Sequence, residues 1–383
     1  MKICYVISTV NIAGGANRSL LDMIGLVKKA GHECVVLGPA KGSIEKELNR
    51  MNITYKVIPF RSSVKSANTV RNCLKQGMNH FARQAIKRFF KKEHFDLVHN
   101  NSLPTMVGME AATSVNIPYV CHIRENVWNG LGMEFINNEN VKKVIRDASA
   151  DIAISEYILE DYTKFEPNGK YYVINDGINI NDYYEKKDIL NKNVISIGMV
   201  GVINPQKGQE EAVRAIEILR ERGYDQIKLE IIGMDGAWNG SRDYAYNLKK
   251  YVIDKNLDCV HFTPAVESSE ELKNLRSEHD INLICSRAEG LGRTTIESML
   301  SGSLTIAAEA GATPEILGNF KQGLLYECGN PSDLADKIEY VINHKAEMRT
   351  LAIKGQEYAV NHFSAENYVR SILGLYEEII GNC

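Results

Sequence analysis

The hydrophobic pattern of this chain alternates between two kinds of segment along its whole length. Short apolar runs, typical of buried strands, are followed by longer stretches with apolar residues every three or four positions, as in amphipathic helices. Residues 16–30 show this helical spacing, with apolar side chains at Leu20, Met23, Ile24 and Val27. Strands that alternate with helices predict a parallel sheet with right-handed crossovers.

The pattern starts again near residue 194, after a polar stretch at residues 181–192 that we interpret as a linker. We therefore predict an α/β fold with two Rossmann-like doubly wound domains facing a cleft. The predicted domains are residues 1–185 and 186–364, and a C-terminal helix in residues 365–383 packs back onto the first domain. The strand candidates lie at residues 3–7, 34–37, 55–58, 97–99, 119–122, 152–155, 172–174, 194–200, 229–232, 260–262, 281–285 and 304–307.

Composition agrees with this reading and excludes some functions. The 383 residues fit two domains of roughly 100–200 residues each. The net charge of −3 argues against a nucleic-acid-binding protein. The eight cysteines include no C-x-x-C pair, which argues against zinc and favours buried thiols in a reducing compartment. No apolar run reaches the roughly 18 residues of a membrane span, so we expect a cytoplasmic protein.

One region departs from this balance of charges. Residues 61–92 contain nine Lys or Arg and no Asp or Glu, and Phe81, Ile86, Phe89 and Phe90 lie among the cations. A basic amphipathic helix of this kind can lie on an anionic membrane surface. We therefore expect peripheral contact with the inner face of the cell membrane through residues 61–92. The alternative is a solvated basic face on a core helix.

The segment from Glu289 to Glu297, Glu-Gly-Leu-Gly-Arg-Thr-Thr-Ile-Glu, carries the sharpest chemical signal. It follows the apolar run 281–285 and opens a helical stretch. Gly290 and Gly292 let the backbone approach a ligand closely, and the helix N-terminus behind them suits a diphosphate. Glu297 can accept two hydrogen bonds from vicinal hydroxyls, as on a ribose, and Glu289 can reach a sugar. Two surface glutamates beside an ordinary turn are the alternative.

Two glycine-containing loops also follow strands. Residues 201–208 end in Lys207-Gly208 and join a strand to a helix, where a Rossmann-like domain presents its ligand-binding edge. Lys207 can neutralise a diphosphate there. In the first half of the chain, Gly14, Gly15 and Arg18 follow the first strand. Because these glycines do not form G-x-G-x-x-G, a dinucleotide is not expected.

His122 ends the strand candidate at residues 118–121, and Arg124 and Glu125 follow it. A histidine at the carboxyl end of such a strand is expected to point into the cleft. A structural core histidine remains the alternative. For Arg124 and Glu125, contact with the acceptor or a phosphate and a plain surface position are both open.

These segments together resemble the family 4 retaining glycosyltransferases of GT-B fold. The signature is the pair of glutamates with seven residues between them and Glu-Gly-x-Gly at the start. The continuation through residues 298–302, 306–308 and 311–315 is similar to the same family segment. The resemblance covers nearly the whole chain and is strongest from residue 194 to residue 330.

The resemblance implies roles for the residues of the second domain. Glu297 would hold the donor ribose, and Glu289 would contact the donor sugar or support the transition state. The remaining donor-binding positions would be Lys207, Gly208, Gly290, Leu291, Gly292, Arg293 and Thr294. The family usually has an arginine where this chain has Val202, and Arg293 is the candidate substitute for that cation.

The resemblance also implies roles in the first domain. His122 would lie near the donor sugar and stabilise the reacting centre, and Gly15 would contact the donor. Gly14, Arg18, Arg124 and Glu125 would lie on the acceptor side. The family often has a glutamate where this chain has Asn17, which leaves the role of that position open.

The implied reaction is transfer of a sugar from a nucleotide-sugar, with a UDP-sugar favoured, and with retention of anomeric configuration. No metal and no other cofactor are expected. The acceptor would be a glycan or a polyprenyl-linked glycan in surface polysaccharide assembly. The rivals are a related enzyme of the same fold, an epimerase or a phosphorylase, and a non-catalytic nucleotide-sugar-binding protein.

Overall fold

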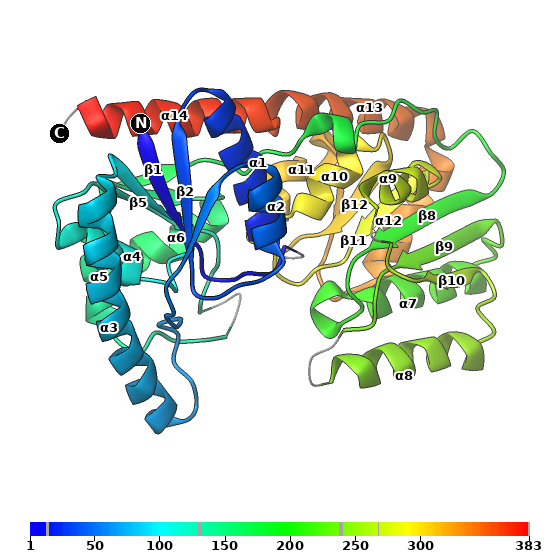
Figure 1. The fold of residues 1–383 in the computed structure, drawn as a ribbon. Coiled ribbons are helices and arrows are strands. Elements are labelled where there is room, and N and C mark those ends of the chain that lie inside the picture. Colours follow the sequence, from blue (N-terminus) through cyan, green and yellow to red (C-terminus); the bar gives the residue numbers. More distant parts are fainter. Residues whose placement is uncertain (13–14, 129–131, 237–239, 267, 382–383) are drawn as a thin grey trace. The chain divides into compact units, whose positions relative to one another are not determined.

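A computed structural model describes residues 1–12, 15–128, 132–236, 240–266 and 268–381 of the chain. The chain divides into two compact units, each a parallel sheet covered by helices (Figure 1). Unit 1 comprises Met1–Ile178 with Ala365–Cys383, and unit 2 comprises Asn179–Ser364. The two-sheet α/β fold predicted from the hydrophobic pattern is confirmed. The first unit ends at residue 178, whereas the pattern placed that boundary at residue 185.

Unit 1 contains a seven-stranded parallel sheet in the order β3-β2-β1-β4-β5-β6-β7. The strand order reverses between β1 and β4, which makes the carboxyl ends of these two strands the switch point of the sheet. The central strands are buried along their whole length and begin with apolar residues. The strands are β1 (Lys2–Val6), β2 (Glu33–Gly38), β3 (Thr54–Val57), β4 (Leu97–Asn100), β5 (Tyr119–Ile123), β6 (Ala150–Ala153) and β7 (Tyr171–Val173).

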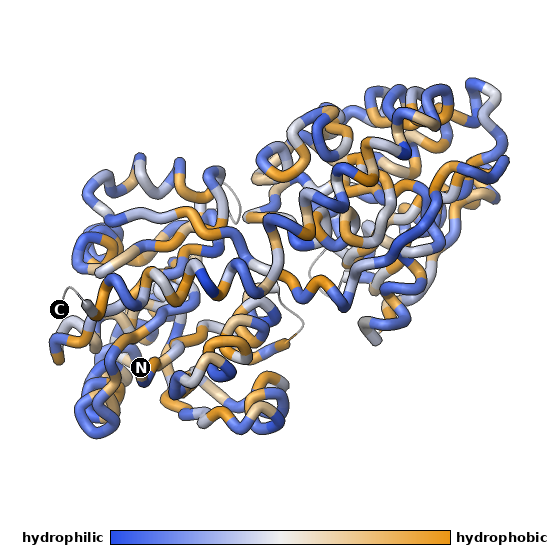
Figure 2. The backbone as a smooth tube through the Cα atoms, turned by 90° about the horizontal axis from the view of Figure 1, so that it is seen from above, coloured by the Kyte–Doolittle hydropathy of each residue, from blue (hydrophilic) through white to orange (hydrophobic). Residues whose placement is uncertain are grey.

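The last helix of the chain belongs to unit 1. It packs beside α1 on the same core, burying Val369, Ile372 and Leu375 at helical spacing. Apolar and polar positions alternate along the helices of both units (Figure 2). The helices of unit 1 are α1 (Gly15–Lys29), α2 (Ile44–Arg50), α3 (Thr69–Glu93), α4 (Val107–Thr113), α5 (Asn138–Arg146), α6 (Glu156–Phe165) and α14 (Ala365–Gly381).

Unit 2 contains a six-stranded parallel sheet in the order β10-β9-β8-β11-β12-β13, with its switch point between β8 and β11. The strands are β8 (Ile195–Val200), β9 (Ile227–Ile232), β10 (Val260–Thr263), β11 (Ile281–Ile284), β12 (Leu304–Ala308) and β13 (Leu324–Tyr326). The helices are α7 (Gln209–Glu221), α8 (Ser241–Asp254), α9 (Ser269–Ser277), α10 (Arg293–Leu300), α11 (Thr313–Lys321), α12 (Pro331–Asn343) and α13 (Lys345–His362), with short 3₁₀ turns at Ile180–Asp182 and Pro205–Lys207.

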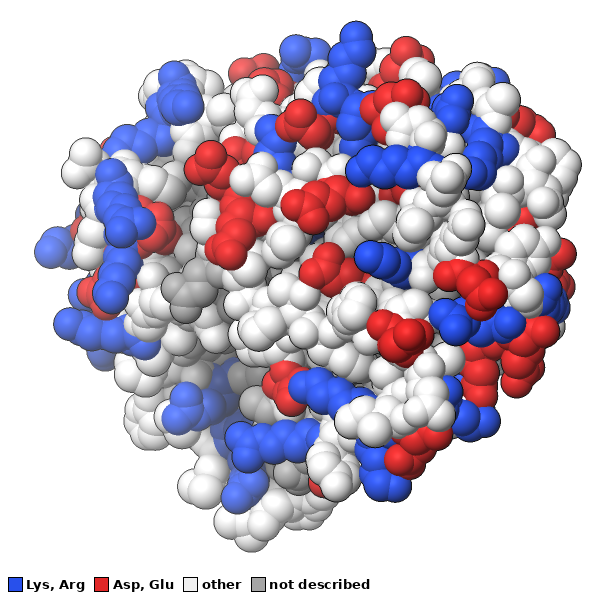
Figure 3. Space-filling model, turned by 90° about the vertical axis from the view of Figure 1, so that its right-hand side faces the viewer, with Lys and Arg blue, Asp and Glu red and all other residues white. Residues whose placement is uncertain are grey.

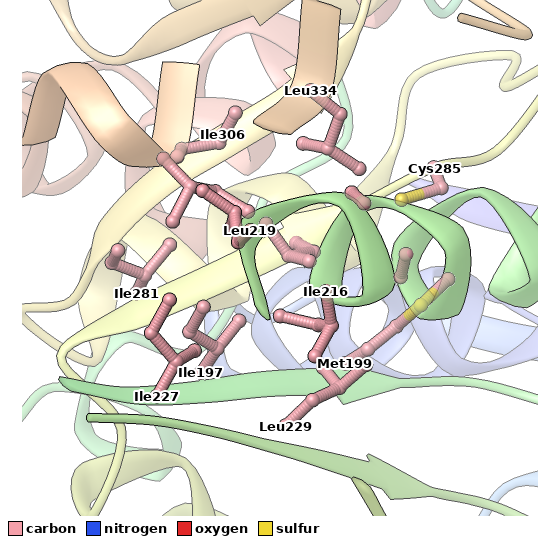
Figure 4. Packing of buried hydrophobic residues seen from close by; sticks show 14 of the residues in the cluster. Ile197, Met199, Ile216, Leu219, Ile227, Leu229, Ile281, Cys285, Ile306 and Leu334 are labelled. Atoms are coloured by element: carbon pink, nitrogen blue, oxygen red, sulfur yellow. The ribbon is translucent and has the colours of Figure 1, made fainter. Parts of the chain in front are cut away.

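The core of unit 2 forms between α7 and the sheet. Ile216 and Leu219 of α7 point toward strand residues such as Ile197 and Leu229 (Figure 4). Full burial of one such side chain stabilises the fold by about 1.5–3 kcal/mol. This packing holds α7, and therefore the turn in front of it, in a fixed position on the sheet.

The polar stretch at residues 181–192 is not a free linker, so this prediction is wrong. The Nζ atom of Lys187 donates to the carbonyl oxygens of Arg276, Ser277 and His279, at 3.1, 3.2 and 2.6 Å. It also donates to Ser303 Oγ at 2.7 Å. A long side chain that satisfies carbonyls at the end of α9 fixes the segment to unit 2, a contact that polar composition does not reveal.

The described surface carries mixed charge. On the face shown in Figure 3, basic and acidic side chains lie interspersed. Among the described residues, no helix combines the length and the apolar character needed to cross a bilayer.

Candidate functional site

In unit 2, the predicted site residues follow β8 and β11, the two strands at the switch point. After β8, Asn204 accepts a hydrogen bond from the Lys207 backbone amide at 3.0 Å, and Pro205 starts the 3₁₀ turn that presents Lys207. After β11, the loop carrying Glu289 leads into α10. Lys207 Nζ lies 2.5 Å from Glu289 Oε1, so the structure brings these two predicted residues together as an ion pair.

Gly208 makes this juxtaposition of the two loops sterically feasible. Its φ is 69°, in the left-handed region that disfavours a side chain. A Cβ atom at this position would lie 2.2 Å from the carbonyl oxygen of Cys285, in the loop after β11. The backbone amide of Arg287 in turn donates to the Gln206 carbonyl at 2.9 Å. Backbone contact between the loops therefore sets the position of Lys207 relative to Glu289.

The backbone of Glu289 is held from a second side by the turn after β12. The Ala312 amide donates to the Glu289 carbonyl at 3.0 Å. A Cβ atom at Gly311 would lie 2.5 Å from that same oxygen, so only glycine permits the contact. Gly292 has φ 92° and forms the N-cap of α10, which no side chain caps. Leu291 is buried.

Glu297 lies on the first turns of α10 and is buried between two guanidinium groups. Arg276 donates from Nη2 to Glu297 Oε2 at 2.7 Å, and Arg293 Nε lies 3.8 Å from Oε1. The Arg276 guanidinium also lies over the Tyr183 ring, 5.8 Å from its centroid. The two guanidinium groups orient the Glu297 carboxylate as a hydrogen-bond acceptor.

Sequence reasoning missed Arg276. It is the last basic residue of α9, and a single arginine at a helix end reads as a surface residue. Its Nη1 atom is buried and has no hydrogen-bond partner among the described residues. Arg293, the candidate substitute for the missing cation at Val202, lies on the Glu297 side of the site. Thr294 follows it and is partly buried.

In unit 1, His122 and Arg124 lie at the carboxyl end of β5 and are both buried. Arg124 donates from Nη1 to both oxygens of Asp176, at 2.7 and 2.6 Å, and from Nε to Asn101 at 2.9 Å. The surface alternative for Arg124 is therefore wrong. Ser102 donates to both oxygens of Glu125 at 3.1 Å, and burial raises the pKa of that carboxyl.

His122 is part of a buried polar chain that sequence reasoning also missed. Its Nδ1 atom lies 3.1 Å from His99 Nε2 and 3.4 Å from Arg124 Nη2. His99 Nδ1 lies 2.6 Å from the Tyr376 hydroxyl on α14. Burial and the charge of Arg124 lower the pKa of His122 well below its usual value and that of His99 to about 3. Both imidazoles are therefore neutral.

The first loop of unit 1 is partly described. Gly14 lies outside the described residues, and Gly15 is the first residue of α1. Asn17 is buried, and its Nδ2 atom donates to the carbonyls of Thr9 and Asn11 at 3.1 and 2.9 Å. Asn17, which stands where the family often has a glutamate, therefore holds the loop after β1 in place. Arg18 is exposed on α1.

Two family models match successive parts of the chain. The model described as "Glycosyltransferase Family 4" matches residues 13–182, and "Glycosyl transferases group 1" matches residues 182–358. An uncharacterized glycosyltransferase of Methanocaldococcus jannaschii is 25% identical over 296 residues, which span 76% of this chain and 78% of that protein.

A further curated relative is also a glycosyltransferase, and a solved structure has the same fold. The capsular polysaccharide biosynthesis glycosyltransferase CapM of Staphylococcus aureus is 24% identical over 207 residues, spanning 54% of this chain and 51% of CapM. Among solved structures, Anabaena HepE in complex with UDP-glucose is similar, with a TM-score of 0.79 and 22% identity over 99% of this chain and 100% of that one. The structural likeness shows that the two share a fold.

Proposed function

The chain belongs to the group 1 and family 4 glycosyltransferases, and on this premise we propose that it moves a sugar from a UDP-sugar to a glycan or lipid-linked acceptor, with retention of configuration. The observation that carries the proposal is the arrangement at the unit 2 switch point. There, Lys207 and Glu289 form an ion pair between the loops after β8 and β11, and the arginine-flanked Glu297 follows on α10. The choice of UDP is supported by the UDP-glucose complex of HepE, which has the same fold.

In the proposed reaction, the main cost is the negative charge that develops on the departing diphosphate. Lys207 and the N-terminus of α10 supply positive charge for it, and Arg293 is the proposed second cation in place of an arginine at Val202. Glu297 accepts hydrogen bonds from the ribose hydroxyls. Before the donor binds, Lys207 is paired with Glu289, so the diphosphate must replace this carboxylate. Glu289 is then available to the donor sugar.

Retention is proposed through departure and attack on the same face of the sugar. The bond from the anomeric carbon to the diphosphate oxygen breaks, and the bond to the acceptor oxygen forms. The acceptor proton passes to the departing phosphate. We also propose that transfer needs no metal, which predicts unchanged rates in excess chelator.

The function is tested by incubating the enzyme with UDP-sugars and acceptor extracts and measuring UDP release and glycosylated product. Glu289→Gln is expected to abolish most transfer, and Glu357→Gln, on the exposed face of α13, is the matched control. UDP release together with an acceptor-linked sugar supports the proposal. Conversion of the donor without acceptor indicates an epimerase, phosphate-dependent release of sugar indicates a phosphorylase, and binding without turnover indicates a non-catalytic protein. Each of these outcomes overturns the proposal.

We further propose that α3 rests on an anionic membrane, which would place the enzyme beside a polyprenyl-linked acceptor. Apolar residues recur every three or four positions on one exposed face of its first half, and Phe81 there is 76% exposed. That face continues as Arg88 and Lys92, for which no acidic partner is found among the described residues. The exposed apolar residues are Val70, Leu74, Met78 and Phe81.

A groove beside this face supports the same proposal. It has a volume of about 670 Å³ and lies between the edge strand β3 and α3. Val35, Val57 and Phe89 line it with apolar surface, while Arg88 and Lys92 contribute positive charge. Its two acids, Glu33 and Glu93, are both paired with Lys2. The net local charge therefore suits lipid phosphates.

Vesicle sedimentation tests the membrane contact. Vesicles containing phosphatidylglycerol should retain the protein in a salt-dependent manner, and vesicles of phosphatidylcholine alone should not. The double variant Arg88→Glu/Lys92→Glu should weaken binding by at least about 30-fold, because each surface cation contributes about 1 kcal/mol. Lys345→Glu/Lys354→Glu on α13 makes the same change of net charge and should bind like the wild type. Equal binding by both double variants would refute the role of α3.

A further inference from the structure

The buried chain from Tyr376 to His122 selects one proton position on a histidine, and we propose that its purpose is to present His122 Nε2–H as a fixed hydrogen-bond donor to the substrate. The inference rests on the proposed function, because that function supplies the substrate. It assigns positioning roles to His99 and to Tyr376 of α14, the helix at the end of the chain.

The direction of every hydrogen bond in the chain follows from Arg124. A guanidinium has only donors and stays protonated, so the ring nitrogen that faces it must be an acceptor. That nitrogen is His122 Nδ1, 3.4 Å from Arg124 Nη2. A neutral imidazole with an unprotonated Nδ1 carries its proton on Nε2. The contact with Arg124 thus favours the Nε2–H form of His122, and the shorter contact of His99 with the same nitrogen adds to this preference.

The same logic then passes to the next two residues. His99 Nε2 lies 3.1 Å from His122 Nδ1, which is an acceptor, so His99 must donate from Nε2. His99 Nδ1 is consequently an acceptor, and the Tyr376 hydroxyl, 2.6 Å away, must donate to it. Burial raises the pKa of Tyr376, so its hydroxyl keeps the proton that it donates. The hydrogen bonds therefore run in one direction: the Tyr376 hydroxyl donates to His99, and the Nε2–H group of His99 donates to His122.

Arg124 is itself held so that it cannot turn away. Its Nη1 atom is fixed by both oxygens of Asp176 and its Nε by Asn101, while Nη2 also donates to Tyr368 on α14 at 3.3 Å. Two separate partners therefore act on the same atom, His122 Nδ1: the guanidinium and the His99–Tyr376 pair. Both depend on α14.

These hydrogen bonds leave the second ring nitrogen of His122 without a partner. His122 Nε2 is buried and has no hydrogen-bond partner among the described residues. A buried donor without a partner destabilises a folded protein, so each such group calls for an explanation. An oxygen of the substrate, such as a hydroxyl of the transferred sugar, would remove this penalty. Because His122 is neutral, it would offer the substrate a hydrogen bond but no positive charge.

Nitrogen NMR on protein labelled with ¹⁵N-histidine tests the proton position directly, with the signals assigned through His122→Gln and His99→Gln. The wild type should show His122 and His99 both as Nε2–H forms. A wild-type His122 protonated on Nδ1 would overturn the inference even in an active enzyme. This measurement needs no sugar, so it is informative even if the protein transfers none.

Tyr376→Phe tests the positioning role. It should move the His122 nitrogen signals only part of the way toward an average of the two forms, because Arg124 still faces Nδ1. It should also lower kcat by up to about tenfold, the effect of losing one neutral hydrogen bond, with little change in KM for the donor. His99→Gln should restore most of the activity that His99→Phe loses, because a glutamine amide can donate to His122 and accept from Tyr376.

Tyr119→Phe is the matched control, since it removes a buried hydroxyl of the same unit that donates to the Val144 carbonyl at 2.6 Å. It should change neither the nitrogen signals nor kcat. If Tyr376→Phe and Tyr119→Phe behave alike, the chain is merely structural and the inference fails. A His122 Nε2 signal that shifts with UDP-sugar but not with UDP supports contact with the sugar, and no shift with a UDP-sugar that the enzyme turns over overturns that contact.

Discussion

Replacement of Gly208 by alanine should damage unit 2 much more than the same change at Gly223, and the difference measures the contact between the two loops of the site. The two glycines lie just before and just after α7, with φ of 69° and 89°. Alanine in the left-handed region costs roughly 1–2 kcal/mol at either position. A Cβ atom at Gly223 meets nothing within 4 Å, so this strain is its whole effect.

At Gly208 the new Cβ atom would also lie 2.2 Å from the Cys285 carbonyl oxygen and 3.0 Å from the Cys285 Cβ atom. Neither atom belongs to a flexible side-chain end, so the loop after β11 or the turn carrying Lys207 must move. Overpacking of this kind typically adds about 1–3 kcal/mol. We therefore expect Gly208→Ala to lower the free energy of unfolding by about 2–5 kcal/mol and Gly223→Ala by about 1–2 kcal/mol.

Urea unfolding of both variants, followed by a signal from unit 2, gives the two free energies. Titration with UDP by calorimetry then reports on the site. Gly208→Ala should weaken UDP binding because it displaces Lys207 from the loop that carries Glu289, whereas Gly223→Ala should bind UDP like the wild type. Equal losses of stability in the two variants, or unchanged UDP binding in Gly208→Ala, would refute the steric reasoning.

Three further outcomes are expected. Glu289→Gln should bind UDP several-fold more tightly than the wild type by calorimetry while losing transfer, because Lys207 no longer has to leave a carboxylate; weaker UDP binding would contradict the proposed exchange of partners. Lys187→Met should destabilise unit 2 by about 2–3 kcal/mol in urea unfolding, because three carbonyls lose their donor, whereas the exposed Lys354→Met should be neutral. Asp151→Asn should raise the free energy of unfolding, measured in urea at pH 5.5 and at pH 8.5, and the increase should be larger at pH 8.5. Burial raises the pKa of the Asp151 carboxyl, whose oxygens have no hydrogen-bond partner among the described residues. The wild-type protein therefore loses stability as pH rises through the folded-state pKa of this carboxyl, whereas an asparagine at this position does not ionise. An equal effect at both pH values would refute this.

Sequence alone identified the elements that local periodicity encodes. A buried parallel strand is a largely apolar run, and a helix on its face shows apolar residues every three or four positions, so the strands of both sheets could be located except the short β13, which no candidate covered. The motif from Glu289 to Glu297 could be recognised in the sequence because it is also local. Its glycines, its charged residues and the following helix lie within one short segment, and the structure keeps them together at the start of α10.

The tertiary structure alone decided which distant residues complete each site. Arg276 reaches Glu297 from another helix, and Tyr376 reaches His99 across 277 positions of sequence. No local pattern marks such partners, because each is an ordinary arginine or tyrosine until the sheet brings its helix beside the site. The same reason explains the error at residues 181–192. A polar stretch such as this one can be a linker or a segment bound to a domain, and its sequence looks the same in both cases. Here the carbonyl oxygens that accept from Lys187 bind it to unit 2, and only tertiary packing places those oxygens beside Lys187.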